Sequence, residues 1–154
     1  MFYGGRRSSV SAIINLHMKI VLMVWFILMP LLAIAQKKPV QIVFDVTSSD
    51  SSTHDAVLRH VKGLASAYPE AKLEVVVYGA AWPMLVNGKS RAATSVAELA
   101  RLDNVDFKLC GITMERHGVK PTDLVTGVEV VPDAIMEIVT RQGEGWGYIK
   151  ESHH

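Results

Sequence analysis

Short apolar runs alternate with amphipathic segments along most of the chain. The runs are continuous and rich in β-branched residues, which is typical of strands covered on both faces. They predict four strands and a last short extended piece, at Val40–Val46, Leu73–Tyr78, Val105–Leu109, Val128–Val131 and Trp146–Ile149. Strands that alternate with helices pair in parallel through right-handed crossovers. We therefore expect an α/β fold, a three-layer sandwich with a mainly parallel sheet.

Apolar residues at helical spacing lie between the first three predicted strands. A first helix is expected to begin with Thr53 as its cap and to end before Pro69. A second helix has Thr94 or Ser95 as its candidate cap and runs to about Leu102. Capping side chains satisfy the free N–H groups of a helix start, so these residues mark where each helix is expected to begin.

Two further helices are indicated by the residues at their ends. The segment Gly111–His117 is expected to form one or two turns, closed by Gly118 in the glycine position that follows helix ends. Pro132 at the first helical position opens the final helix. The inward face of that helix is predicted to hold Ile135, Ile138 and Val139.

One connection, GAAWPMLVNGKS from Gly79 onward, is unusually apolar for a loop. Loops are normally polar, so Trp82 and Leu85 are expected to be exposed on the single chain and covered by another subunit. An apolar lid over a ligand is the other interpretation of this segment. The covered patch predicts a homo-oligomer.

The loops that follow parallel strands gather at one edge of a sheet, and ligands bind there. This places three loop starts together at the carboxyl ends of the predicted strands. The first loop, TSSDSST, contains no glycine for close approach to a phosphate and is interpreted as a capping turn. The expected binding rim consists of Thr47, Ser48, Gly79, Trp82, Gly111 and Thr113.

The N-terminal part of the chain has the pattern of a secretory signal peptide. From Met18 a charged start is followed by an apolar run and by the small residues Ala33 and Ala35. The run is shorter than the roughly 18 residues that a membrane-spanning helix needs, so we expect cleavage after Ala35 and no stable membrane anchor after processing. Translation starts at Met1 or at Met18. The mature protein is expected to be periplasmic or secreted.

This interpretation divides the chain at residue 35. Residues 1–35 form an N-terminal extension and leader, and residues 36–154 form one domain, which is long enough for a single core. The formal net charge is +1 and the basic residues are scattered, so no nucleic-acid partner is expected. The chain lacks dinucleotide-binding, P-loop, HxxxH and CxxC motifs, so neither a cofactor nor a metal is expected.

Cys110 is the single cysteine of the chain and lies at a predicted strand-to-helix junction. The free N–H groups of a helix start stabilise a thiolate, which suits persulfide carriage or thiol exchange. A buried cysteine at the edge of the core is the alternative, because free cysteine packs as a small hydrophobic residue. His117 is the one histidine expected near this thiol. Both interpretations of Cys110 remain open.

Three segments, VVVYGAA, FKLCGITMERHGV and GVEVVPDAIMEIVTRQGEGWGYIK, resemble the DsrE/DsrF-like family, closest to its small YchN-type members. The resemblance implies a flavodoxin-like sheet order and homo-oligomers such as trimers or hexamers. In the sulfur-relay members it implies a cysteine that carries sulfur as a persulfide, and Cys110 matches that position. Thr113 stands where certain relatives have a second cysteine, so disulfide chemistry within one chain is excluded.

Two functions follow as hypotheses. The first is an exported homo-oligomer that carries sulfur, or binds a small sulfur-containing ligand, through Cys110. The alternative is a non-catalytic oligomeric scaffold or small-molecule-binding protein in which Cys110 is structural. An enzyme with independent turnover ranks behind both, because the sequence places no general base beside the thiol.

Overall fold

The computed structural model describes residues 17–19, 23 and 39–152. Residues 17–19 and 23 are helical. The rest of the predicted leader lies outside the described residues, so cleavage after Ala35 stays a prediction. No helix among the described residues is both long enough and apolar enough to cross a membrane.

The centre of the fold is a sheet of five parallel strands in the order β4-β3-β2-β1-β5. The strands are β1 Gln41–Val46, β2 Lys72–Val77, β3 Val105–Cys110, β4 Val128–Val131 and β5 Gly147–Glu151. All four strands and the final extended piece expected from the sequence are present. The predicted α/β class with a parallel sheet is therefore confirmed.

The order of the strands reverses beside β1. Strands β1 to β4 follow one another across the sheet, and the chain then crosses back so that β5 pairs with the other side of β1. The layered parallel architecture is the expected flavodoxin-like one. In flavodoxin, however, the second strand of the chain occupies that edge, in the order 2-1-3-4-5, whereas here the fifth strand does.

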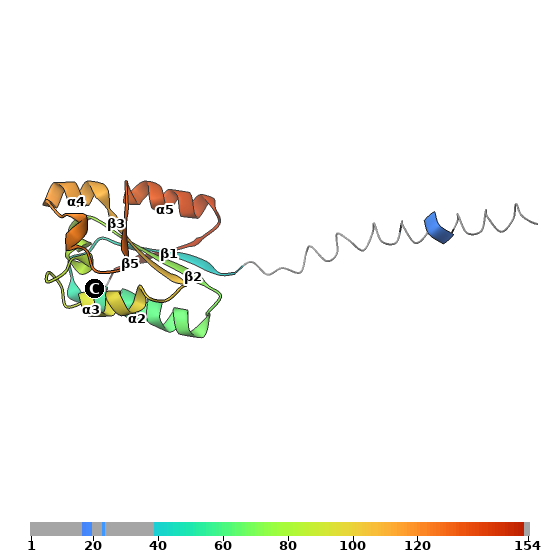
Figure 1. The fold of residues 1–154 in the computed structure, drawn as a ribbon, viewed down its shortest axis with the longest axis horizontal. Coiled ribbons are helices and arrows are strands. Elements are labelled where there is room, and N and C mark those ends of the chain that lie inside the picture. The colour runs from blue at the N-terminus through green and yellow to red at the C-terminus, as the bar shows by residue number, and fades with distance from the viewer. Residues whose placement is uncertain (1–16, 20–22, 24–38, 153–154) are drawn as a thin grey trace, which may run out of the picture. The chain divides into compact units, whose positions relative to one another are not determined.

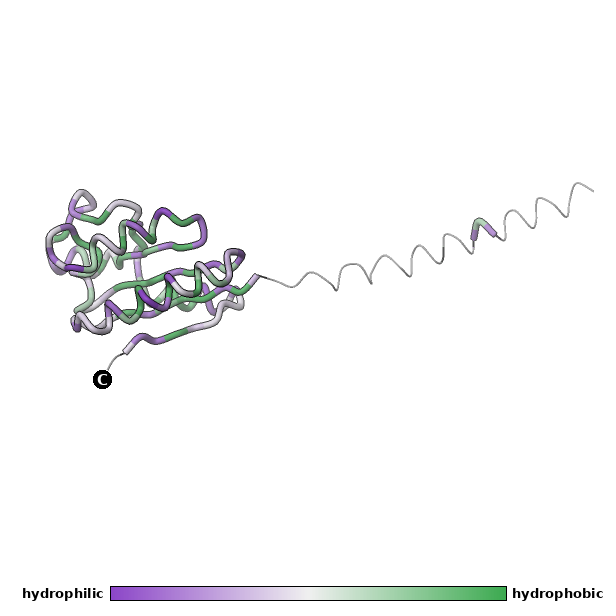
Figure 2. Tube along the Cα trace, turned by 90° about the horizontal axis from the view of Figure 1, so that it is seen from below, coloured by the Kyte–Doolittle hydropathy of each residue, from purple (hydrophilic) through white to green (hydrophobic). Residues whose placement is uncertain are grey.

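Helices cover both faces of the sheet, which gives the three predicted layers. The helical elements are α2 Ser51–Ala67, η1 Gly79–Leu85, α3 Ala93–Leu99, α4 Gly111–His117, η2 Pro121–Asp123 and α5 Ala134–Gly143. Figure 1 shows α2 and α3 on one side of the sheet and α4 and α5 on the other. The core consists of strand residues and of the helix faces that pack on them. Figure 2 shows the chain coloured by hydropathy, with its hydrophobic stretches in green.

The cap of the first long helix differs from the prediction. Asp50 caps α2, because its Oδ1 accepts a hydrogen bond of 2.9 Å from the N–H of Ser52. Thr53 lies inside the first turn and is fully buried. The helix therefore begins two residues before Thr53, since the carboxylate of Asp50 already satisfies a free N–H group there.

The caps of two other helices are also corrected. Helix α3 begins at Ala93 without a side-chain cap, so neither Thr94 nor Ser95 caps it. In α5 the cap is Asp133, whose Oδ1 accepts a hydrogen bond of 2.8 Å from the N–H of Ile135. Pro132 lies outside the helix. The left-handed Gly118 after α4, with φ of 64°, is confirmed.

The inward face of α5 was predicted only in part. Ile138 is buried, but Ile135 and Val139 are 58% and 52% exposed. The face towards the sheet holds Ala134, Ile138 and Arg141, at spacings of four and three residues, so helical periodicity puts Ile135 and Val139 outside.

The apolar segment η1 is part of the core. Ala81, Met84 and Leu85 are fully buried, and they pack with residues of β2, β3 and α3. The expectation that Leu85 is exposed is therefore wrong, because a 3-10 helix turns this stretch inward. Trp82 is only half-buried.

Candidate functional site

Cys110 is the last residue of β3 and directly precedes α4. Its side chain is 5% exposed. It packs in a small cluster on the α5 side of the sheet, with Val43, Val76, Ala134 and Ile138. The thiol thus lies at the carboxyl edge of the sheet, largely covered by the start of α5.

A buried carboxylate organises the polar side chains beside this cluster. Asp45 is 5% exposed and accepts hydrogen bonds from Tyr148 Oη at 2.7 Å, from Lys150 Nζ at 2.9 Å and from Tyr78 Oη at 3.4 Å. Lys150 Nζ also donates to Thr47 Oγ1 at 2.8 Å. We call these five residues, Asp45, Thr47, Tyr78, Tyr148 and Lys150, the Asp45 network.

The strand register brings the Asp45 network and the thiol together. Val77 pairs with Leu109, so the next residues of the two strands, Tyr78 and Cys110, are level and face the same side. On the other side of β2, Asp45 pairs with Val76. The network thus spans the carboxyl halves of β1, β2 and β5.

Ligands of open parallel sheets bind at the carboxyl edge where the strand order reverses. In this chain that position is between β1 and β5. Asp45 and Lys150 are paired across those two strands, and the Lys150 side chain is 39% exposed. The network therefore offers hydrogen-bond donors to a polar or anionic ligand at the expected edge.

Both tyrosines of the network are donors at neutral pH. The hydrogen bond to Asp45, together with burial and the Asp45 charge, raises the pKa of Tyr148 to about 12. Burial, the Asp45 charge, the Asp45 hydrogen bond and the nearby Cys110 raise the pKa of Tyr78. Each cause penalises a second negative charge next to Asp45, so the phenols keep their protons.

Three of the six predicted rim residues, Thr47, Gly79 and Thr113, lie in or next to this network. Gly79 N–H donates to Thr113 Oγ1 at 3.2 Å, and a Cβ on Gly79 would be 3.9 Å from the carbonyl oxygen of Thr47. Gly111 passes close to β4, where an added Cβ would be 3.3 Å from the carbonyl oxygen of Val131. Their role in binding stays a prediction.

Ser48 and Trp82 take other positions. Ser48 belongs to the turn before α2, where its Oγ accepts from Asp50 N–H at 3.1 Å and its carbonyl oxygen is 2.8 Å from His54 Nε2. Trp82 stacks on His117 with ring centroids 5.1 Å apart. The stacked pair lines a separate cavity of about 480 Å³, so Trp82 does not cover the Asp45 network.

Sequence reasoning missed four members of the network, Asp45, Tyr78, Tyr148 and Lys150. Asp45 carried a usable signal, because a single carboxylate inside a run of buried apolar residues needs partners. Tyr148 and Lys150 carried none, since they join Asp45 only because β5 pairs with β1. Within the described residues, no group of three or more His, Cys, Asp or Glu side chains could hold a metal ion.

The geometry defines a small parallel α/β protein with one thiol at the carboxyl edge of its third strand. The sequence model of the DsrE/DsrF-like family matches residues 41–150, and the chain belongs to this family. A search of curated proteins found no match.

Solved structures with the same fold are available for comparison. A protein of unknown function from Methanobacterium thermoautotrophicum is 32% identical, with a TM-score of 0.68, and the match covers 72% of this chain and 98% of that one. The ychN protein of E. coli is 18% identical, with a TM-score of 0.61 and coverages of 74% and 99%. A conserved protein of unknown function from Bacteroides thetaiotaomicron is 12% identical, with a TM-score of 0.60 and coverages of 71% and 93%. The last two matches support the fold alone.

Proposed function

We propose that this chain is an exported, homo-oligomeric DsrE-like protein that carries sulfur as a persulfide on Cys110. One observation carries the proposal: the single thiol of the chain lies at the carboxyl edge of the sheet, level with Tyr78 of the Asp45 network. Membership of the DsrE/DsrF-like family supports the same chemistry.

The proposed reaction is an exchange between sulfur atoms and needs no oxidant. The Cys110 thiolate attacks the outer sulfur of a small persulfide, R–S–SH, and a new S–S bond forms while the donor's S–S bond breaks. The electron pair of the broken bond leaves on R–S⁻, which takes a proton from water. An acceptor thiolate later attacks the outer sulfur of the Cys110 persulfide and releases the Cys110 thiolate.

A second candidate function is favoured by burial. Cys110 is 5% exposed among apolar side chains, which fits a structural residue. In that case the Asp45 network binds a small polar molecule on an oligomeric scaffold, and the thiol takes no part.

Loading with sulfur separates the two functions. The native protein and a Cys110→Ser variant are incubated with glutathione persulfide, and their intact masses are measured before and after reduction. A carrier gains one sulfur atom that reduction removes, and the variant gains none. A native protein that gains sulfur only after unfolding has a structural cysteine, which favours the second function.

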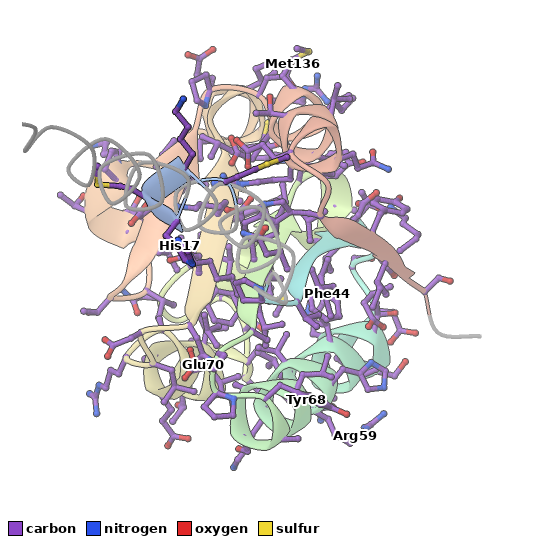
Figure 3. All side chains as sticks on the ribbon, turned by 90° about the vertical axis from the view of Figure 1, so that its right-hand side faces the viewer. His17, Phe44, Arg59, Tyr68, Glu70 and Met136 are labelled. Atoms are coloured by element: carbon purple, nitrogen blue, oxygen red, sulfur yellow. The ribbon has the colours of Figure 1, made fainter. Side chains whose placement is uncertain are left out.

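The oligomer is proposed to form through α5. Its outer face carries the exposed side chains of Ile135, Met136 and Val139, and Figure 3 shows Met136 on the outer side of the helix. Exposed apolar side chains in one stripe favour a covered surface. We propose a trimer or a hexamer. Export to the periplasm or the medium is proposed from the leader pattern of residues 18–35.

A further inference from the structure

We infer that the phenol of Tyr78 positions the sulfur of Cys110, donating its O–H to that sulfur whenever the sulfur is anionic, as a thiolate or as a persulfide. The inference deepens the proposed function and rests on it for the persulfide state. Tyr78 is a positioning residue here, because the bonds that form and break are those of the sulfur atoms.

The register of the sheet places Tyr78 beside the thiol. Tyr78 follows β2 directly and is level with Cys110 on the neighbouring strand, on the same face of the sheet. Its backbone N–H continues the sheet by donating to the carbonyl oxygen of Val46 at 3.1 Å. Its side chain packs against the apolar cluster that contains Cys110. Ring and thiol are therefore neighbours at the carboxyl edge.

The hydrogen bonds of Asp45 leave Tyr78 as the least committed donor. Tyr148 Oη is 2.7 Å from Asp45 Oδ2, and Lys150 Nζ is 2.9 Å from Oδ1. Tyr78 Oη is 3.4 Å from Oδ2, beyond the usual range of about 2.5 to 3.0 Å for O–H···O bonds. The carboxylate stays satisfied without Tyr78, so turning the phenol towards an anionic sulfur costs little.

The charges around Tyr78 also keep its phenol protonated, so that it remains a hydrogen-bond donor. Asp45 and Cys110 both disfavour a phenolate, so they raise the pKa of Tyr78 after the larger effect of burial. Lys150 Nζ lies 5.7 Å from the centre of the ring. The protonated phenol thus stands beside two groups that can each be negative, and it can donate to either one.

Tyr148 provides a matched control. It donates to the same carboxylate oxygen as Tyr78, but the causes of its raised pKa include Asp45 and Tyr78 and not Cys110. The variants Tyr78→Phe and Tyr148→Phe each remove one hydroxyl group from Asp45. Only the first removes the hydroxyl group beside the thiol.

The test is alkylation of folded full-length protein by iodoacetamide, with thermal unfolding used to check that each variant is folded. At about pH 7 we expect Tyr78→Phe to slow alkylation about tenfold, because a hydrogen bond to a charged acceptor is lost. At about pH 10, where thiols ionise without help, the difference should shrink to less than about twofold. At about pH 7, Tyr148→Phe should slow alkylation less than Tyr78→Phe does, because it keeps the Tyr78 hydroxyl group and only frees one acceptor position on Asp45. At about pH 10 it should stay within about twofold of wild type.

Equal rates for the two variants at neutral pH would overturn the inference. So would a wild-type thiol that reacts only after unfolding. Alkylation needs no sulfur donor, so the result is independent of sulfur loading. If Tyr78→Phe is alkylated slowly but the wild type takes up no sulfur, the role of Tyr78 is supported and the carrier function is ruled out. If the wild type takes up sulfur but the two variants are alkylated at equal rates, the carrier function is supported and the role of Tyr78 is ruled out.

Discussion

At the scale of single residues, the α5 side of the sheet depends on a buried ion pair. Glu74 is fully buried, and its Oε2 accepts from Arg141 Nη2 at 2.8 Å and Nε at 3.1 Å. Burial raises the pKa of Glu74, while the hydrogen bonds and charge of Arg141 oppose that rise. Arg141 also lies 4.9 Å over the ring of Trp146. One side chain thus joins β2, α5 and the residue that precedes β5.

Replacing Arg141 by Ala should destabilise the fold. The change leaves the Glu74 carboxylate buried without its partner, which costs about 3 kcal/mol in the free energy of unfolding. Urea unfolding at neutral pH measures the change. Glu144→Ala is the control: it removes a half-exposed partner of Arg141, 49% exposed, and should cost less than about 1 kcal/mol. Equal effects of the two variants would show that the buried pair is not the cause.

Tyr148 gives a prediction in alkaline solution. Its folded pKa of about 12 lies above the unfolded value of 10.0, so the folded state holds the proton more tightly. The stabilisation is fully present below the unfolded pKa and is lost as pH rises through the folded pKa. Tyr148→Phe should therefore lower the free energy of unfolding by only about 1 kcal/mol at neutral pH, since the ring is partly exposed. The gap between wild type and variant should close above the folded pKa, and a constant gap in alkaline urea titrations would contradict this account.

At the scale of helices and strands, the local sequence pattern predicts where an element lies more reliably than it predicts the cap of that element or the face that is buried. The strands are predicted by continuous runs of β-branched residues, and recognising such a run requires no knowledge of the elements that pack against it. Thr53 is the cap that the sequence predicts for α2, but Asp50, whose residue type also caps helices well, takes that role. The local sequence does not say which of several capping side chains meets a free N–H group. For α5, the helical spacing of apolar residues predicts an amphipathic helix. That spacing does not predict which of the two apolar stripes of the helix packs on the sheet.

The outer stripe of α5 should hold the oligomer together. Val139→Glu puts a charge into the proposed interface and leaves the core unchanged, because Val139 is exposed. The proposed oligomer should therefore dissociate into monomers, which light scattering measures. Leu102→Glu is the control, because Leu102 is also exposed, at 42%, but lies after α3 on the other side of the sheet. An oligomer that survives Val139→Glu would place the interface elsewhere. A wild-type monomer at micromolar concentration would remove it altogether.

At the scale of the whole molecule, the sequence predicted the layered parallel fold, but the strand order differs from the flavodoxin-like order that the family resemblance implied. The return of β5 to the side of β1 depends on pairing between residues about a hundred positions apart, such as Asp45 with Lys150. That same pairing builds the Asp45 network. The thiol could be singled out from the sequence, whereas the polar side chains beside it could not.

The proposed export is also tested on the whole chain. Cleavage after Ala35 should leave a mature protein that begins at Gln36. N-terminal sequencing of protein recovered from a secreting host measures this directly. A variant with Ala33 and Ala35 both replaced by bulky residues should remain unprocessed, since signal peptidase requires small residues at those positions. Uncleaved chain in the cytoplasm of the wild-type strain would contradict export.

The most direct test of the sulfur-carrier account is the chemical state of one peptide. Native protein is incubated with a small persulfide, blocked by alkylation while still folded, and digested, and the peptide containing Cys110 is analysed by mass spectrometry. The account predicts an alkylated persulfide on Cys110 that is absent when reductant precedes the blocking step. A Cys110 that carries only the alkyl group, or that is blocked only after unfolding, would contradict it.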